Sequence, residues 1–402
     1  MMNAEPAIDM AVSSIRERSQ RHVMLIVSSM GAGGAERVAA TLCNAWVARG
    51  DRVTLVATYS KPCQSFYPLD PRVNFVSLAT LPGVGGLGPI RDLSRFLALR
   101  RLISSEAPDV LLSFLTVVNV ATIIASIGLN VPLVVTEHTY PPSLRERWTI
   151  ENLRRLLYPL ASGVVMLTSE GRDWVNREIP RASTYVVPNP IEFPLPAGNP
   201  MIQVDRLVPG TASVLMSAGR FDAGKQFHHL IEAFAPLHER HPDWMLVIFG
   251  DGPERPKLER LVSALGMDSA VLLPGRAGNL GDWFARAELF ALTSRWEGFS
   301  MVIAEALSHG CPAVSYDCDV GPRDMIEHGR NGLLVPPGEG VQGLITAIGG
   351  LMDDDERRYS MASVANGVLR QFSVDAVTGQ WDVVFEHVRA AARPADQRPR
   401  QQ

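Results

Sequence analysis

Two apolar runs of strand length, residues 23–28 and 213–219, each lead into a glycine-containing loop and then into a helical pattern. Continuous apolar runs of this kind are typical of parallel strands that are buried on both faces. After the first run, the helical pattern ends at a capping glycine, Gly50, and another apolar run follows at residues 53–58. This order of strand, loop, helix and strand is a βαβ unit. The sequence therefore predicts an α/β fold with two doubly wound parallel sheets.

The same alternation continues through both halves of the chain. Further strands are predicted at residues 73–78, 110–114, 133–136, 163–167, 184–187, 244–250, 271–275, 288–293 and 313–316. Helices are predicted at residues 37–49, 90–105, 226–240, 255–265, 301–308 and 374–391. A proline-dense stretch at residues 187–200 separates the two series and is interpreted as an interdomain linker. In sheets of this type ligands bind at the carboxyl ends of the strands, so we expect a ligand between the two domains.

Length and composition agree with a globular protein of two domains. The chain has 402 residues, of which 46% are hydrophobic and 20% are charged. Its net charge of −4 gives no indication of a nucleic-acid partner. The four cysteines fit neither a disulfide framework nor a zinc pattern, which favours a reducing, cytoplasmic setting. Residues 1–20 lack the apolar core of a signal peptide and are predicted to be a disordered extension, as is the tail at residues 392–402.

Residues 110–136 contain no charged side chain, a length that would suffice for a membrane span. Polar residues, a glycine and a proline interrupt the stretch at short intervals. A buried strand, a short helix and a second buried strand explain this pattern better, and a transmembrane helix is the alternative.

Two cations, Arg220 and Lys225, lie in the glycine-bracketed loop after the strand predicted at residues 213–219. Together with the free amides of a helix N-terminus, they would suit a diphosphate. The alternative is two ordinary surface charges in a turn.

Two carboxylates, Glu297 and Glu305, are separated by seven intervening residues around the start of the helix predicted at residues 301–308. Carboxylates accept hydrogen bonds from the vicinal hydroxyls of a sugar, and the amides between them suit a phosphate. The apolar neighbours of Glu305 predict a buried carboxylate, which is costly without partners. The alternative is one glutamate at a helix start and one on an amphipathic helix.

Other polar features are weaker signals. Gly31, Gly33 and Gly34 follow the first strand, but Glu36 stands where a dinucleotide-binding loop has its third glycine, and no acidic residue closes the second strand. The glycines therefore favour close approach of some other ligand. His138 follows a strand and is expected to point toward a ligand, with a hydrogen-bonded structural histidine as the alternative. The acidic pair around Cys318 is interpreted as a polar loop rather than a metal site.

These features together resemble the retaining glycosyltransferases of family 4, which have the GT-B fold of two facing Rossmann-like domains with a donor cleft between them. The resemblance runs from Gly33 and Gly34 to the final helix, and its motifs are most specific in the C-terminal half. It rests on Gly219-Arg220-x4-Lys225, Gly250-Asp-Gly-Pro, Glu297-x7-Glu305, Asp324 after Gly321-Pro322, and Gly329-x-Asn331-Gly332-Leu-Leu-Val-Pro-Pro-Gly338. It implies an N-terminal acceptor-side domain at residues 21–195, a donor domain at residues 205–372, and a final helix at residues 374–391 that packs back on the first domain.

The resemblance also implies a role for each matching residue. Arg220 and Lys225, with Gly219 before them, would hold the donor diphosphate, Glu305 the ribose and Glu297 the hexose hydroxyls. The amides of Gly298, Phe299, Ser300 and Met301 would contact the sugar and the distal phosphate. Arg276 would meet the base, and His138 would contact the transferred sugar. Gly33 and Gly34 would lie near the phosphates on the acceptor side.

The implied activity is transfer of a hexose or N-acetylhexosamine from a UDP- or GDP-sugar, with retention of configuration. No metal or other cofactor is implied, because the two cations replace it at the departing diphosphate. Same-face attack is favoured, since no carboxylate nucleophile is marked. Ser300 departs from the glycine that many members have there, so donor preference cannot be carried over from them.

The subgroup resembles bacterial transferases for capsule, exopolysaccharide or O-antigen, which act on polyprenyl-diphosphate-linked acceptors at the cytoplasmic face of the inner membrane. Basic residues interleaved with apolar ones in two helical patterns predict a peripheral contact with that membrane, with a normal solvated helix face as the alternative. The basic residues are Arg91, Arg95, Arg100 and Arg101 in one pattern and Arg145, Arg147, Arg154 and Arg155 in the other.

Three other classes of function stay open at this point. The first is an NAD-dependent oxidoreductase using the first βαβ unit, which the missing acidic residue disfavours. The second is another enzyme on the same scaffold, such as a nucleotide-sugar epimerase or a phosphorylase. The third is a non-catalytic nucleotide-sugar or glycan-binding subunit, which would have no need of both cations and both glutamates.

Overall fold

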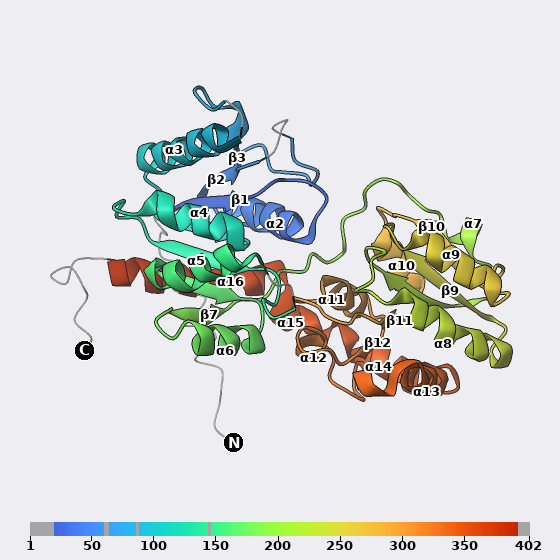
Figure 1. Ribbon diagram of the computed structural model, residues 1–402. Helices are drawn as coiled ribbons and strands as arrows, with labels where there is room; N and C mark the ends of the chain where they lie inside the picture. The colour runs from blue at the N-terminus through green and yellow to red at the C-terminus, as the bar shows by residue number, and fades with distance from the viewer. Residues whose placement is uncertain (1–19, 60–63, 86–87, 144–145, 393–402) are drawn as a thin grey trace, which may run out of the picture. The chain divides into compact units, whose positions relative to one another are not determined.

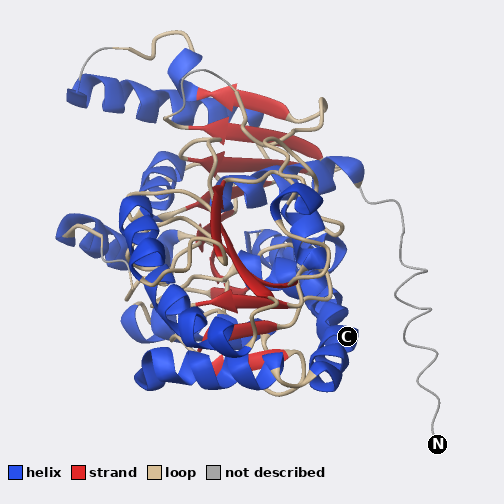
Figure 2. Cartoon of the chain, turned by 90° about the vertical axis from the view of Figure 1, so that its right-hand side faces the viewer, coloured by secondary structure: helices blue, strands red, loops and turns tan. Residues whose placement is uncertain are grey.

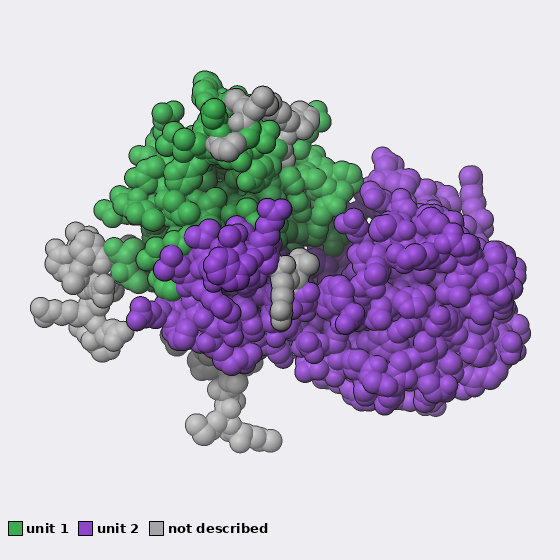
Figure 3. Space-filling model, in the orientation of Figure 1, with its two compact units in different colours: residues 1–136, 157–163, 385–402 green, residues 137–156, 164–384 purple. Residues whose placement is uncertain are grey.

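The computed structural model describes residues 20–59, 64–85, 88–143 and 146–392. The chain divides into two compact units (Figure 3). Unit 1 comprises residues 1–136, 157–163 and 385–402, and unit 2 comprises residues 137–156 and 164–384. The predicted disordered ends, residues 1–20 and 392–402, lie outside the described residues except for their innermost positions, and so do Cys63 and Arg145.

The first sheet has seven strands in the order β3-β2-β1-β4-β5-β6-β7 (Figure 1). The strand bounds are β1 His22–Val27, β2 Arg52–Ala57, β3 Asn74–Ser77, β4 Val110–Phe114, β5 Leu133–Glu137, β6 Gly163–Met166 and β7 Thr184–Val186. β1 pairs in parallel with β2 on one side and with β4 on the other. Every residue of β1, β4 and β5 is buried, as the uninterrupted apolar runs predict.

The second sheet has six strands in the order β10-β9-β8-β11-β12-β13, and all of its pairings are parallel. The strand bounds are β8 Ser213–Ala218, β9 Trp244–Phe249, β10 Val271–Gly275, β11 Leu289–Leu292, β12 Ala313–Tyr316 and β13 Gly332–Val335. Counted within each sheet, both orders begin 3-2-1-4-5-6, the doubly wound arrangement in which strand order reverses next to the first strand. The predicted fold class of two doubly wound parallel sheets is therefore confirmed.

Helices connect the strands and line both sides of them (Figure 2). The helices of four or more residues that follow strands of the first sheet are α2 Gly34–Ala48, α3 Gly88–Glu106, α4 Thr116–Ser126, α5 Trp148–Leu157 and α6 Ser169–Glu178. Later in the chain they are α7 Val204–Leu207, α8 Phe227–Arg240, α9 Arg255–Ala264, α10 Leu280–Arg286, α11 Met301–Ser308, α12 Pro322–Met325, α13 Gly340–Met352, α14 Asp355–Ala365, α15 Leu369–Phe372 and α16 Val374–Ala392.

Two hydrophobic clusters cover opposite faces of the second sheet. Leu215 of β8 belongs to one cluster, whereas its neighbours Val214 and Met216 belong to the other. This alternation follows from the two-residue period of a strand. Helices α8, α9 and α13 supply the first cluster, and α10 and α11 supply the second. The sheet is thus fixed from both sides, and its loops project from a rigid frame.

The uncharged stretch at residues 110–136 forms β4, α4 and β5, as the interruptions in its apolar pattern predict. Among the described residues, no helix combines the length and the apolar character required to cross a bilayer. The cysteines Cys43, Cys311 and Cys318 are buried and free.

The proline-dense stretch predicted as a linker is tied to unit 2 by backbone hydrogen bonds. The amide of Ile191 donates to the carbonyl of Phe372 at 2.7 Å, and that of Gly198 donates to Gly278 at 2.7 Å. In unit 1, Phe385 near the end of α16 packs on Trp46, with ring centroids 5.5 Å apart.

Candidate functional site

The candidate site lies where the strand order of the second sheet reverses. β8 and β11 are neighbours there, with Leu289 in register with Leu215. In doubly wound sheets, ligands bind outside the carboxyl ends of the strands at this point. The loop after β8 carries Arg220 and Lys225, and the loop after β11 carries Glu297. Topology alone therefore places the two predicted groups of residues in adjacent loops.

A side-chain turn at Asp222 shapes the loop after β8. One carboxylate oxygen of Asp222 accepts hydrogen bonds from the amides of Gly224 at 2.9 Å and Lys225 at 3.2 Å. Aspartate commonly closes a turn in this way on amides two or three residues ahead. Gln226 then adopts a left-handed conformation with φ of 47°, and α8 begins at Phe227.

Three contacts join this loop to the loop after β11. The hydroxyl of Thr293 donates to the carbonyl of Lys225 at 2.9 Å, and the amide of Arg295 donates to the carbonyl of Gly224 at 2.8 Å. The Trp296 indole lies so close to Gly224 that a Cβ there would come within 2.9 Å of the ring carbon Cζ2. Gly224 is thus required by close packing, and the two loops form one unit.

The joined loops bring Lys225 and Glu297 into contact. The Lys225 Nζ lies 2.5 Å from Oε1 of Glu297, and the two side chains are 21% and 10% exposed. Arg220, five residues earlier, is exposed, and its guanidinium makes no ion pair with any residue that the structure describes. The site therefore holds one cation that is already paired and one that is open to solvent.

The turn that follows Glu297 presents its backbone rather than its largest side chain. Phe299 is buried in the core, where it makes an edge contact with Phe372 at 5.4 Å between ring centroids. Ser300 is the N-cap of α11 in a left-handed conformation with φ of 58°. Its hydroxyl is buried and has no hydrogen-bond partner among the described residues. A non-glycine residue in this conformation is uncommon and is typical of functional sites.

Glu305 lies in the second turn of α11 and is only 2% exposed. Its neighbours Ala304 and Ala306 are fully buried. The buried, apolar setting predicted for this carboxylate is therefore confirmed.

His138 lies directly beyond β5, against the turn at Gly298. A Cβ on Gly298 would come within 2.6 Å of the His138 carbonyl oxygen, so the approach depends on glycine. His138, Gly298 and Val320 line a small hollow of about 10 Å³. Burial of the imidazole lowers the pKa of His138 to about 3, so the ring is neutral at physiological pH.

The loop at Gly321 closes the other side of the same turn. A Cβ on Gly321 would lie 3.1 Å from the Ser300 hydroxyl, and Gly321 itself has a φ of 103°. Burial and the nearby charge of Glu170 raise the pKa of Asp324 to about 6. One carboxylate oxygen of Asp324 and one of Glu170 are buried without a hydrogen-bond partner among the described residues.

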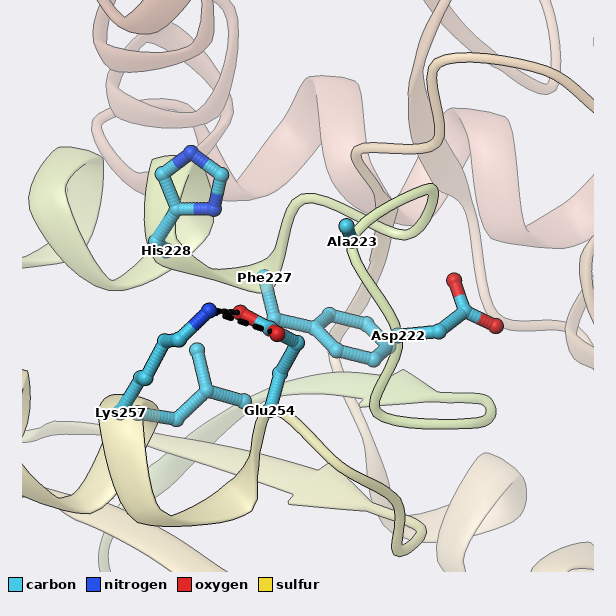
Figure 4. A pocket seen from close by; sticks show the side chains of 7 residues that line it. Asp222, Ala223, Phe227, His228, Glu254 and Lys257 are labelled. Atoms are coloured by element: carbon cyan, nitrogen blue, oxygen red, sulfur yellow. Dashed lines mark hydrogen bonds and ion pairs between the residues drawn. The ribbon is translucent and has the colours of Figure 1, made fainter.

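A larger hollow of about 280 Å³ lies on the far side of the Asp222 turn (Figure 4). Asp222, Phe227 and His228 line it together with Glu254 and Lys257. Its polar groups are already engaged, because Lys257 Nζ lies 2.8 Å from Glu254 Oε1 and Asp222 holds the turn. The residues predicted to bind a donor do not line this hollow.

Two family models match this chain, one in each half. The model described as Glycosyltransferase Family 4 matches residues 32–193, and the model described as Glycosyl transferases group 1 matches residues 212–354. The α-D-kanosaminyltransferase of Streptomyces kanamyceticus is 31% identical over 278 residues, which cover 65% of this chain and 72% of that protein. The chain belongs to glycosyltransferase family 4.

Two further known proteins align with nearly the whole length of this chain. The GalNAc-α-(1→4)-GalNAc-α-(1→3)-diNAcBac-PP-undecaprenol α-1,4-N-acetyl-D-galactosaminyltransferase of Campylobacter jejuni is 28% identical over 372 residues, which cover 92% of this chain and 99% of that enzyme. The crystal structure of Anabaena HepE in complex with UDP superposes with a TM-score of 0.74 and 21% identity, covering 91% of this chain and 99% of that one. The second likeness supports the GT-B fold.

The structure brings together most of the predicted site residues of this family 4 glycosyltransferase. The Gly219–Lys225 and Glu297–Met301 segments adjoin, and His138 lies against Gly298. Arg276 is exposed after β10 and shares no hydrogen bond or ion pair with these residues. Gly33 and Gly34 are in unit 1, where a Cβ on Gly33 would come within 2.2 Å of a Glu36 carboxylate oxygen. The roles assigned to all these residues by resemblance stay predictions.

Three structural residues of the family 4 site are missing from the sequence prediction. Asp222 and Thr293 hold the cation loop, and Trp296 covers it. The spacing of Asp222 and Gly224 is a recognisable turn signal, which the sequence carries. The contacts of Thr293 and Trp296 join segments about seventy residues apart, and nothing local indicates them.

Proposed function

We propose that this glycosyltransferase moves a hexose or an N-acetylhexosamine from a UDP- or GDP-sugar to a glycan acceptor, with retention of configuration. The observation that carries the proposal is the convergence of the Arg220–Lys225 loop and the Glu297–Met301 turn at the strand-order reversal of the second sheet. Cations, helix N-terminal amides and a carboxylate are the groups that a diphosphate-linked sugar requires. The UDP complex of HepE, a protein of the same fold, supports a nucleotide in this class of site.

In the proposed reaction, the bond between the anomeric carbon and the diphosphate oxygen breaks, and the acceptor hydroxyl bonds to that carbon on the same face. Arg220, Lys225 and the amides before α11 stabilise the charge on the departing diphosphate, with no metal ion required. Glu297 and the neutral His138 hold hydroxyls of the transferred sugar, and Glu305 holds the ribose. The acceptor proton passes to the departing phosphate oxygen.

The proposed acceptor is a polyprenyl-diphosphate-linked intermediate of exopolysaccharide, capsule or O-antigen assembly. Two relatives support it: the galactosaminyltransferase of C. jejuni, whose name specifies an undecaprenol-linked acceptor, and a glycosyltransferase of amylovoran biosynthesis. We further propose that α3 meets the cytoplasmic face of the membrane through an apolar ridge of Ile90, Leu93 and Leu97, which are 71%, 58% and 41% exposed.

The ridge, rather than the arginines, carries the proposed membrane contact. Arg100 donates two hydrogen bonds to carbonyls at the end of α4, and the Arg95 guanidinium lies 5.1 Å from the ring centroid of Tyr59. Arg154 of α5 is buried and pairs with Glu151. Because these three arginines contact other parts of the chain, the proposed membrane contact rests on the apolar ridge, and it stays a proposal.

Donor and stereochemistry can be tested together. A panel of UDP- and GDP-sugars is screened by thermal shift, and the product of each stabilising donor is examined by NMR for the configuration at its anomeric carbon. We expect one nucleotide class to stabilise the protein and the product to keep the donor's configuration. An inverted product or a trapped glycosyl–enzyme adduct would overturn the proposed mechanism.

The same assays separate the rival activities. Release of epimerised donor without acceptor would indicate an epimerase, and dependence on inorganic phosphate would indicate a phosphorylase. Binding without turnover on any glycan or lipid-linked acceptor would favour a non-catalytic subunit. Activity that persists after chelation of divalent ions is expected, because the two cations do the work of a metal.

The membrane contact is tested by sedimentation with vesicles of phosphatidylethanolamine, phosphatidylglycerol and cardiolipin. Leu93→Glu combined with Leu97→Glu should abolish most of the binding. The control is Leu265→Glu in unit 2, another exposed leucine at 38%, which should bind as the unmodified chain does. Equal binding by all three proteins would exclude the ridge.

A further inference from the structure

The Lys225–Glu297 ion pair joins two residues that the proposed function assigns to different parts of the donor. Lys225 is assigned to the diphosphate and Glu297 to the sugar, yet their charged atoms lie 2.5 Å apart. Both side chains are largely shielded from water, which strengthens the attraction between them relative to an exposed pair.

The surrounding contacts hold this ion pair in place. Asp222 fixes the amide of Lys225, Thr293 fixes its carbonyl, and Trp296 packs beside it on Gly224. Hydrogen bonds and packing therefore anchor the backbone on the Lys225 side of the pair to the loop that carries Glu297. The pair is therefore a built feature of the site rather than a chance meeting of two long side chains.

A diphosphate that enters this site must share Lys225 with Glu297. Lysine carries a single compact charge, so a carboxylate beside it reduces the attraction left for a phosphate. Glu297 also adds a negative charge next to the negative diphosphate. Arg220 is exposed, has no ion pair among the described residues, and carries no such penalty.

The attached sugar changes this balance. When the nucleotide carries a hexose, the sugar hydroxyls donate to Glu297 and compensate for its partial loss of Lys225. After transfer the sugar is gone, and the carboxylate faces the nucleoside diphosphate without those donors. We infer that Glu297 competes with the diphosphate for Lys225, so that the site binds the intact donor in preference to free nucleoside diphosphate and releases that product quickly.

This inference rests on the proposed function. If Glu297 only helped to bind the donor, its loss would leave the affinity for nucleoside diphosphate unchanged or lower, whereas competition for Lys225 predicts a higher affinity. Glu297→Gln keeps the size and one acceptor oxygen of the side chain but removes its charge. We expect the variant to bind free UDP or GDP about tenfold more tightly, the scale of one charge a few ångströms away. Its transfer activity should fall, because the sugar loses its carboxylate. Isothermal titration with each nucleoside diphosphate measures the first effect.

The matched control is Glu254→Gln, which removes the same charge from another Lys–Glu pair of unit 2, the one with Lys257. That variant should bind nucleoside diphosphate as the unmodified chain does. In a double-mutant cycle, Glu297→Gln should bring a clearly smaller gain in the Lys225→Gln background than in the unmodified chain, because the competition for Lys225 is then gone and only the repulsion by the carboxylate is relieved. Should Glu297→Gln fail to fold, Glu297→Asp, which draws the carboxylate back from Nζ, should show a smaller gain.

The outcomes separate the two proposals. Nucleoside diphosphate binding that is unchanged or weaker in a folded Glu297→Gln variant would overturn this inference and leave the proposed function intact. A gain of the same size in the Lys225→Gln background would also overturn it. If the unmodified chain binds neither UDP nor GDP, with or without a sugar, the proposed function itself fails.

Discussion

The loops after β1 and β8 occupy the same position in their respective sheets but differ in charge. Each follows the first strand of a sheet with the same strand order, contains glycines, and leads into a helix. The first turn of α2 contains Glu36, which accepts a hydrogen bond from the Ser29 hydroxyl at 2.9 Å. The first turn of α8 has no acidic residue, and Arg220 and Lys225 precede it.

This difference indicates which of the two loops, the one after β1 or the one after β8, is better suited to a phosphate. A helix N-terminus attracts anions through its free amides and its dipole. A carboxylate in the first turn offsets part of that positive potential, so less attraction is left for a bound anion. Glu36 therefore makes the start of α2 less attractive to an anion, whereas two cations precede the start of α8. Topology selects the position, and charge selects the ligand.

The largest expected effect comes from removing the cations of the unit 2 loop. Lys225→Ala or Arg220→Ala should lower kcat/KM for transfer by about 100-fold or more, the scale of losing one charged contact to a departing group. Arg37→Ala, which removes a cation after the unit 1 loop, should change it by less than about fivefold. Initial rates with the preferred donor test both. Comparable losses in all three variants would erase the contrast between the loops.

A smaller effect is expected from loosening the unit 2 loop without removing its charge. Asp222→Ala leaves the amides of Gly224 and Lys225 without their acceptor and should lower kcat/KM by about tenfold through misplacement of Lys225. The free energy of unfolding should fall by roughly 1 kcal/mol. Asp251→Ala is the control, since that side chain also accepts from a glycine amide, at 2.9 Å, in the adjacent loop. Equal losses of kcat/KM in the two variants would mean that the Asp222 turn does not specifically position Lys225.

Asp324 is an acid of unit 2 that lies close to the turn before α11. Burial and the charge of Glu170 raise the pKa of Asp324 from its ordinary 3.8 to about 6. The folded state therefore favours the neutral acid, and the stability this gives is present below pH 3.8 and is lost as the pH rises through about 6. Asp324→Asn, which stays neutral, should exceed the unmodified chain in unfolding free energy by about 1–2 kcal/mol at pH 7.5.

The advantage of Asp324→Asn should shrink as the pH falls from about 6 toward 4, measured by urea denaturation across that range. Asp319→Asn, an exposed neighbour in the same segment, should show no such trend. A constant difference across the whole range would mean that the Asp324 carboxyl titrates normally.

The smallest expected effect belongs to the acid of the unit 1 loop. Glu36→Gln removes a favourable charge from the N-terminus of α2 and should lower the unfolding free energy by about 0.5 kcal/mol. Denaturant melts measure the change. If the variant instead gained nucleotide affinity in unit 1, Glu36 would be excluding a phosphate from a second site.

The sequence predicts the frame of this protein better than it predicts its contacts. Every strand up to β12 is predicted. Strands that are buried along their whole length, such as β1, β4 and β5, appear as nearly continuous apolar runs because a doubly covered parallel strand has no polar face. The prediction lacks β13, α13 and α14. Glycines and prolines at residues 329–340 disguise the four-residue strand β13. The bounds predicted for the two domains stay a prediction.

Within the site, motif residues could be predicted and their partners could not. Arg220, Lys225, Glu297 and Glu305 stand in recognisable spacing, and the burial of Glu305 follows from its apolar neighbours. The ion pair between Lys225 and Glu297 joins residues 72 apart in the chain, a distance that no local pattern spans. For the same reason Arg154 and Arg100 read as surface cations, although one is buried and the other binds carbonyls.

Phe299 has a practical consequence for anyone who sets out to change what this enzyme transfers. Its ring is anchored in the core against Phe372, while its amide belongs to the turn before α11. Randomising position 299 would yield variants that differ in melting temperature and expression, because the contact that we propose between that residue and a donor is made by the main chain. The adjacent Ser300 has a buried hydroxyl with no hydrogen-bond partner among the described residues, so the chemical diversity of a donor-selectivity library belongs there.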